Sequence, residues 1–115
     1  MTDRELLENA AKAAGVVGEY ESWTYQGFNE GIRQVLNGIK CWKPWNPLTD
    51  DGDALRLAVK LGISVSYDRL DQGVEERRVF AVWGRGVELE HLGADRYAAT
   101  RRAIVKAAAE IGRKA

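Results

Sequence analysis

The sequence predicts an α+β fold, a single-domain layered sandwich with a mostly antiparallel sheet and about three helices. Helix-capping residues precede apolar positions at helical spacing in three places. Short segments rich in aromatic and β-branched residues separate these places, and the pair Asn37-Gly38 is a strong hairpin signal. A chain of 115 residues has the usual size of one domain, so we expect residues 1–115 to form a single unit.

The first helix is predicted over residues 3–14. Thr2 and Glu5 have the spacing of a capping box, in which each side chain accepts a hydrogen bond from the backbone N–H of the other residue. Gly15 suits the position that ends a helix. The apolar residues that recur at helical spacing are Leu6, Leu7, Ala10, Ala11 and Ala14.

Short strands are predicted in the segment that follows. Aromatic residues favour a strand over residues 20–26. Asn37-Gly38 lies between the apolar segments 32–36 and 39–42, which predicts a tight hairpin there.

The second helix is predicted over residues 50–61. The aspartates of residues 50–53 can cap its first backbone N–H groups and complement its positive end, and Gly62 can end it. Its expected apolar face consists of Leu55, Leu57, Ala58, Val59 and Leu61.

Three further strands are predicted as an antiparallel meander. Apolar and serine residues alternate over residues 63–67, as in a strand with one buried face. The segment 79–83 is apolar on both faces and should be the central strand, reached through a polar loop at 68–72. A tight turn then leads to a strand over residues 87–92.

The third helix is predicted to start at Asp95, which can cap it. Its alanine-rich sequence indicates close packing against the sheet. The expected core-facing residues are Tyr97, Thr100, Ile104, Ala107, Ala108 and Ile111.

The composition argues against several classes of partner. The 17 basic and 17 acidic side chains cancel, so we expect no direct DNA or RNA binding. The N-terminal residues lack a secretion signal and no apolar run approaches the length of a membrane span, so we expect no membrane partner. The single cysteine, Cys41, fits a reducing compartment, and the cytoplasm is the expected location.

We expect the segment 41–57 to be the functional centre. It holds two of the four tryptophans and both prolines, and proline fixes the backbone, so the loop should be rigid. A ligand ring could stack on its indoles while a lysine contacts a phosphate, and an asparagine could read a base edge. The predicted ligand-binding residues are Trp42, Lys43, Trp45, Asn46, Asp50, Asp53 and Arg56.

Each of these residues also has a structural interpretation. The indoles of Trp42 and Trp45 could cover the edge of the core. Asn46 precedes a proline and could begin a turn. The aspartates could serve only as helix caps, and Arg56 could be a solvated side chain.

The residues do not predict an enzyme, a cofactor or a metal site. The aspartates of residues 50–53 lack the spacing of a calcium loop. His91 is the single histidine, and on a strand Glu90 would point to the opposite face. Cys41 has no partner motif for a nucleophile.

Three arginines offer a separate candidate patch. Arg77 and Arg78, with Arg85 across the hairpin, could gather near one end of the sheet. The alternative is that they solvate the sheet edge and oppose aggregation.

The opening residues 1–7 and the run 45–61, WNPLTDDGDALRLAVKL, resemble a family of small phage and prophage proteins, the phage ABA sandwich domain. Residues 20–40 and 72–78 are not aligned with it. The resemblance implies a phage-encoded α/β sandwich of accessory type, with no catalytic residues to carry over. Some small phage proteins of similar size sequester the nucleotide signals of bacterial immunity, which is an analogy of setting.

The sequence therefore predicts a non-enzymatic, phage-encoded binding protein in the cytoplasm of an infected bacterium. The most specific version of this prediction is a sponge, a protein that captures a small nucleotide-type immune signal to counter anti-phage defence. The alternative is a protein–protein adaptor or inhibitor of a host protein that uses the aromatic loop as a hot spot. We expect a homo-oligomer, because a domain this small seldom encloses such a ligand alone.

Overall fold

The computed structural model describes residues 1–68 and 77–115. These residues form three helices and two three-stranded antiparallel sheets, which confirms the predicted α+β class. The helices are α1 (Asp3–Ala14), α2 (Asp51–Leu61) and α3 (Arg96–Arg113). The strands are β1 (Gly18–Trp23), β2 (Asn29–Leu36), β3 (Ile39–Lys40), β4 (Ser64–Tyr67), β5 (Arg78–Trp83) and β6 (Gly86–His91).

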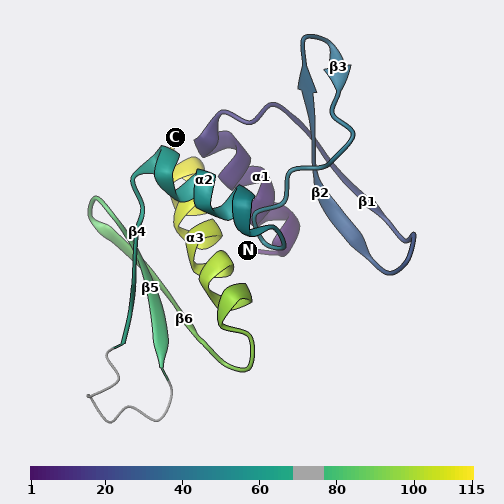
Figure 1. Ribbon diagram of the computed structural model, residues 1–115. Helices are drawn as coiled ribbons and strands as arrows, with labels where there is room; N and C mark the ends of the chain where they lie inside the picture. Colours follow the sequence, from purple (N-terminus) through teal and green to yellow (C-terminus); the bar gives the residue numbers. More distant parts are fainter. Residues whose placement is uncertain (69–76) are drawn as a thin grey trace.

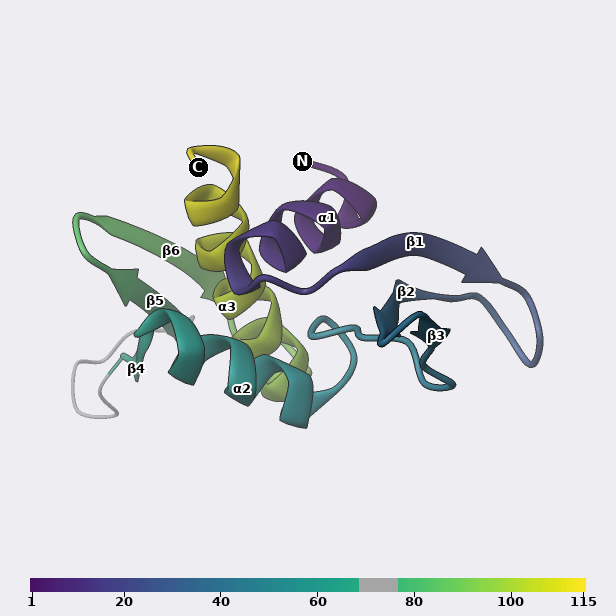
Figure 2. The same ribbon diagram turned by 90° about the horizontal axis from the view of Figure 1, so that it is seen from above.

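The helices lie between the two sheets (Figure 1). Helix α3 is central, because it contacts α1 and α2 as well as strands β5 and β6. The sheet β1-β2-β3 lies at the opposite end of the molecule from the sheet β4-β5-β6, as the view from above also shows (Figure 2). The predicted strands are therefore divided between two sheets with a helical layer between them.

The helix starts follow from local hydrogen bonds. Thr2 Oγ1 accepts from the Glu5 N–H at 3.2 Å, and Glu5 Oε1 accepts from the Thr2 N–H at 3.3 Å. The carboxylate of Asp50 accepts from the Asp53 N–H at 2.8 Å, and Asp95 caps α3 in the same way. The predicted capping residues of all three helices are thus confirmed.

The hairpin and helix-end predictions also hold. Asn37 and Gly38 both have positive φ, 54° and 78°, as the tight turn between β2 and β3 requires. Gly62 has a φ of 68° and ends α2. Strand β5 is the central strand of its sheet, as predicted, while most of the loop predicted at 68–72 lies outside the described residues.

Small side chains allow α1 and α3 to pack closely in the core. The contact surface between the two helices contains no buried aromatic side chain among the described residues. Its buried residues include Leu7, Ala10, Ala11, Ala14, Ala103, Ala107 and Ala108.

Some core predictions were wrong at the side where α2 and β4 face each other. Tyr97 is 67% exposed, although its helical spacing placed it in the core stripe of α3. Leu55 and Val59 of α2 are also exposed, as are Val65 and Tyr67 of β4. The reason is that α2 packs on α1 and α3 and does not lie on the sheet, so these side chains border an open space.

The predicted patch of three arginines does not form. Arg77 and Arg78 lie at the start of β5, whereas Arg85 lies in the turn after its other end. Arg78 instead pairs with Asp68, and their atoms Nε and Oδ2 are 2.9 Å apart.

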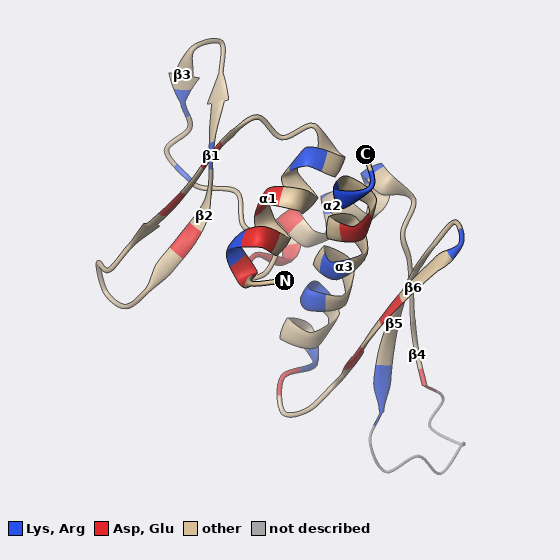
Figure 3. Cartoon of the chain, turned by 180° about the vertical axis from the view of Figure 1, so that it is seen from behind, with Lys and Arg blue, Asp and Glu red and all other residues tan. Residues whose placement is uncertain are grey.

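Charged side chains join β6 to α3. Lys106 lies 3.7 Å from Glu88 and 3.5 Å from Glu90, and Arg102 lies 3.2 Å from Glu90. The acidic strand therefore faces the basic side of the helix, as Figure 3 shows from behind. No helix among residues 1–68 and 77–115 combines the length and the hydropathy that a membrane span needs.

Candidate functional site

Trp45, one of the predicted ligand-binding residues, is a packing residue in this structure. Its side chain is 9% exposed and belongs to the hydrophobic core. Its backbone forms an isolated bridge with Ile32, with both N–H to O distances at 2.8 Å. The backbone bridge therefore attaches the loop to β2, and the indole packs in the core.

Both the nitrogen and the oxygen of the Asn46 side-chain amide form hydrogen bonds with backbone groups. Asn46 is 5% exposed, and its Nδ2 donates to the Glu30 carbonyl at 2.7 Å. Its Oδ1 accepts from the Leu48 N–H at 2.9 Å, and its own N–H donates to the Asp53 carboxylate at 3.0 Å. These contacts fix the turn before α2, which is the structural role considered for this residue.

The remaining charged residues of the prediction form ion pairs around the start of α2. Arg56 lies 2.8 Å from Asp53, and Lys43 lies 3.3 Å from Asp50. The backbone N–H of Asp53, more than the lysine, holds the pKa of Asp50 below its ordinary value. Five of the seven predicted residues thus engage one another here directly or through a shared partner: Lys43, Asn46, Asp50, Asp53 and Arg56.

Trp42 lies apart from this cluster and is 91% exposed. The Arg33 guanidinium donates to the carbonyls of Trp42 and Cys41, which holds the backbone while the indole points into solvent. The ligand-binding role of the loop residues stays a prediction, and none of the seven lines a second candidate site, an apolar cavity among the described residues.

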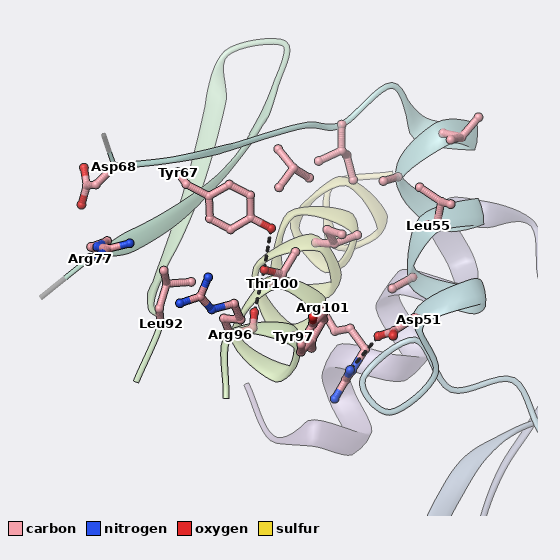
Figure 4. Close-up of a pocket in the computed structure, with 16 residues that line it drawn as sticks. Asp51, Leu55, Tyr67, Asp68, Arg77, Leu92, Arg96, Tyr97, Thr100 and Arg101 are labelled. Carbon is pink, nitrogen blue, oxygen red and sulfur yellow. Dashed lines mark hydrogen bonds and ion pairs between the residues drawn. The ribbon is translucent and has the colours of Figure 1, made fainter. Parts of the chain in front are cut away.

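That cavity, of about 670 Å³, lies between α2, β4 and α3 (Figure 4). Its floor is formed by buried side chains, Ala54, Ala58, Ile63 and Ile104. Its walls contain Leu55, Val59, Val65, Tyr67, Leu92 and Tyr97, and its polar residues are Asp51, Asp68, Arg77, Arg96, Thr100 and Arg101. An apolar cavity of this size with a few polar groups is typical of a small-molecule site.

The hydroxyl groups of Tyr67 and Thr100 both line the cavity. Thr100 Oγ1 donates to the Arg96 carbonyl at 2.8 Å and lies 2.9 Å from Tyr67 Oη. Because the threonine proton is used in the first bond, Tyr67 is the donor in the second. The phenol oxygen of Tyr67 therefore keeps its lone pairs to accept a hydrogen bond from a ligand.

Both carboxylates that line the cavity are paired with arginines. Asp51 Oδ1 lies 2.7 Å from Arg101 Nη1. Asp68 accepts hydrogen bonds from the Arg78 guanidinium and backbone N–H, both at 2.9 Å, and the guanidinium is the main cause of the lowered pKa of Asp68. Asp68 in this state is a weak base, so it is not set up to accept a proton near neutral pH.

Sequence reasoning missed this cavity. It assigned Tyr97 to the core and Arg77 to a surface patch, and it read Val65 and Tyr67 as one buried strand face. One signal was available in α2, whose apolar positions Leu55, Leu57, Ala58 and Val59 extend around more of the helix than one packing stripe needs.

The described residues contain no group of three or more His, Cys, Asp or Glu side chains placed to hold a metal ion. No family model matches the chain, and no curated protein or solved structure matches it. The resemblance to the phage ABA sandwich domain therefore stays a prediction.

Proposed function

We propose that this protein is a non-enzymatic binding protein that captures a small nucleotide-type ligand in the cavity between α2, β4 and α3. The observation that carries the proposal is the cavity itself, with its apolar floor, two tyrosines and three arginines around about 670 Å³. Rings bind to apolar and aromatic walls, and arginine is the side chain best suited to a phosphate.

Capture without turnover is supported by the state of the acidic groups. Asp51 and Asp68 are both paired with arginines. The cavity therefore presents a surface to which a ligand can bind, and the two carboxylates that line it are not free to act as a general base. The resemblance to a phage family supports the wider setting, a phage-encoded sponge that counters bacterial defence in the cytoplasm of the host. This setting rests on the resemblance alone.

The experiment is a thermal shift with a panel of mononucleotides, cyclic mononucleotides and cyclic dinucleotides. A ligand that binds the native state raises the melting temperature. The variant Val59→Trp places an indole at the cavity wall, at a position that is 74% exposed, and should abolish the shift. Val17→Trp is the matched control, since Val17 is equally exposed and lies outside this cavity.

The bound ligand is then released by denaturation and identified by chromatography. Recovery of intact ligand supports capture. A cleaved product would show turnover, and a panel without any shift would remove the nucleotide proposal.

A second candidate function is supported by the surface of the β2–β3 hairpin. Leu36, Ile39 and Trp42 are exposed there, and an exposed tryptophan is a frequent hot spot of protein interfaces. The chain would then act as an adaptor or inhibitor of a host protein. The test compares proteins recovered from bacterial cells with the wild type, Trp42→Ala and the control Tyr25→Ala, which is also exposed. Loss of one specific partner with Trp42→Ala alone would favour this function.

We also propose that the protein self-associates through the outer face of the sheet β4-β5-β6. The register places Phe80, Val82, Val87 and Leu89 on the face that points away from α3, beside Ser64 and Ser66. A two-fold contact sets a surface against itself, so like charges at its centre would repel. Val82, Val87 and Leu89 form an apolar area on this face, and the Arg78 guanidinium that lies 5.2 Å from the Phe80 ring is paired with Asp68, so a second copy of the chain is the partner that fits it.

A further inference from the structure

The charges around the cavity are not balanced at its two ends. Asp51 is paired with Arg101 and Asp68 with Arg78, so both lining carboxylates are neutralised by a neighbouring guanidinium. Among residues 1–68 and 77–115, no carboxylate lies within ion-pair distance of Arg77 or Arg96. Within the described part of the chain, two positive charges without a paired carboxylate therefore remain at the rim.

Arg101 differs from Arg77 and Arg96 because its guanidinium is fixed by hydrogen bonds within the protein. Its Nε donates to the Leu48 carbonyl at 2.8 Å and its Nη1 to Asp51 at 2.7 Å, and its side chain is 16% exposed. Arg101 is therefore part of the wall. Arg77 and Arg96 are exposed and are the groups available to a ligand.

Arg77 and Arg96 belong to the same end of the cavity. The Leu92 N–H donates to the Arg77 carbonyl at 2.9 Å, and Arg96 begins the helix that follows Leu92. Figure 4 shows these three residues beside Asp68, while Leu55 and the rest of α2 lie across the cavity.

We infer that the cavity selects a ligand with one anionic group at one end and a ring or apolar body at the other. The anion lies between Arg77 and Arg96, and the body lies against Ala54, Ala58 and Ile104. A hydroxyl-bearing middle portion meets Tyr67 Oη. This inference rests on the proposed function and narrows it to a mononucleotide-type ligand, because a cyclic dinucleotide carries phosphates on two sides of its ring.

The test compares charged and uncharged partners of the same body by calorimetry. The first pair is adenosine monophosphate and adenosine. The second pair is the sulfonate dye 8-anilinonaphthalene-1-sulfonate and its uncharged counterpart N-phenyl-1-naphthylamine. The wild type should prefer the anionic member of each pair by about tenfold, the usual worth of a charge-assisted hydrogen bond.

Arginine variants locate the preference. Arg77→Gln and Arg96→Gln should each reduce it severalfold, while affinity for the uncharged member stays unchanged. Arg85→Gln is the matched control, because it removes the same charge from an exposed turn outside the cavity.

The outcomes separate the inference from the proposed function. Equal affinity for both members of each pair, or a preference unaffected by both variants, would overturn the inference and leave capture standing. Binding of the sulfonate dye alone, with the expected response to the variants, would support the anionic end and remove the nucleotide. Failure of both pairs to bind would overturn both.

Discussion

Gly112 of α3 lies directly against the backbone of Asn9 in α1. A Cβ atom added at Gly112 would stand 1.9 Å from the Asn9 carbonyl oxygen, far inside van der Waals contact. The two helices approach this closely because small residues line their contact. The core on which both sheets depend therefore tolerates no side chain at this position.

Gly112→Ala should lower the free energy of unfolding by at least about 1–3 kcal/mol, since the helices must separate to admit a methyl group. Gly52→Ala in α2 is the matched control, because the three atoms nearest to its new Cβ are side-chain atoms of Arg56 and Asp50 at 3.2 Å and none is a backbone atom. That control should be neutral or stabilising by up to about 1 kcal/mol, as alanine favours helix. Urea denaturation of both variants measures the difference, and equal effects would contradict the close approach.

The two tryptophans of the loop should respond oppositely to truncation. Trp45→Ala removes a buried indole and should cost about 3–5 kcal/mol of unfolding free energy. Trp42→Ala should change stability by less than about 0.5 kcal/mol, because this indole lies in solvent. Thermal and urea unfolding of the two variants test this, and a stable Trp45→Ala protein would show that the loop is not anchored as described.

Trp45→Ala also bears on the predicted ligand role of the loop. Measured under conditions where the variant is folded, an affinity for the captured ligand within about 1 kcal/mol of the wild type would assign Trp45 to packing alone. A larger loss of affinity, which is the usual contribution of one stacking contact, would show that Trp45 contacts the ligand.

Acid should weaken the fold through its paired carboxylates. Arg78 holds the pKa of Asp68 below its unfolded value, so this group contributes stability above the ordinary aspartate pKa of about 3.9 and loses it as the pH falls through the lowered pKa. Stability should depend on pH in the same direction at Glu5, Glu21, Asp50 and Glu110, because their pKa values are also lowered in the folded protein. In Asp68→Asn the stability at pH 7 should be lower, and its decline below pH 4 shallower. Identical pH profiles would show that the Asp68–Arg78 pair is not formed in solution.

Self-association should depend on the outer face of β4-β5-β6. Val87→Glu places a charge on this face, next to Val82 across the strand pair, and should convert the proposed dimer to a monomer. Val17→Glu is the control, because Val17 is exposed on another part of the molecule. Light scattering across micromolar concentrations gives the mass of each. A monomeric wild type throughout this range would remove the proposal.

Local chemistry was sufficient to predict the starts of the three helices, the ends of α1 and α2, and the turn at Asn37-Gly38. The strand expected over residues 20–26 ends at Trp23, because the chain turns at Gln26, whose φ is 54°. The capping residues Thr2, Asp50 and Asp95 act on N–H groups within three residues of themselves, so their effect can be read along the chain. The Asn37-Gly38 turn likewise depends on backbone conformations that few other pairs adopt. The α+β class followed from the order of these elements.

The division into two sheets and the position of the cavity were decided by tertiary packing. Periodicity shows that Tyr97 and Val65 lie on apolar faces, but whether such a face is covered depends on the angle at which a distant element packs. Here α2 packs on α1 and α3 and leaves its Leu55 side open toward β4. The pairing of Asp51 with Arg101, 50 residues away, could not be read from spacing either, because side-chain contacts at that separation exist only once the chain has folded.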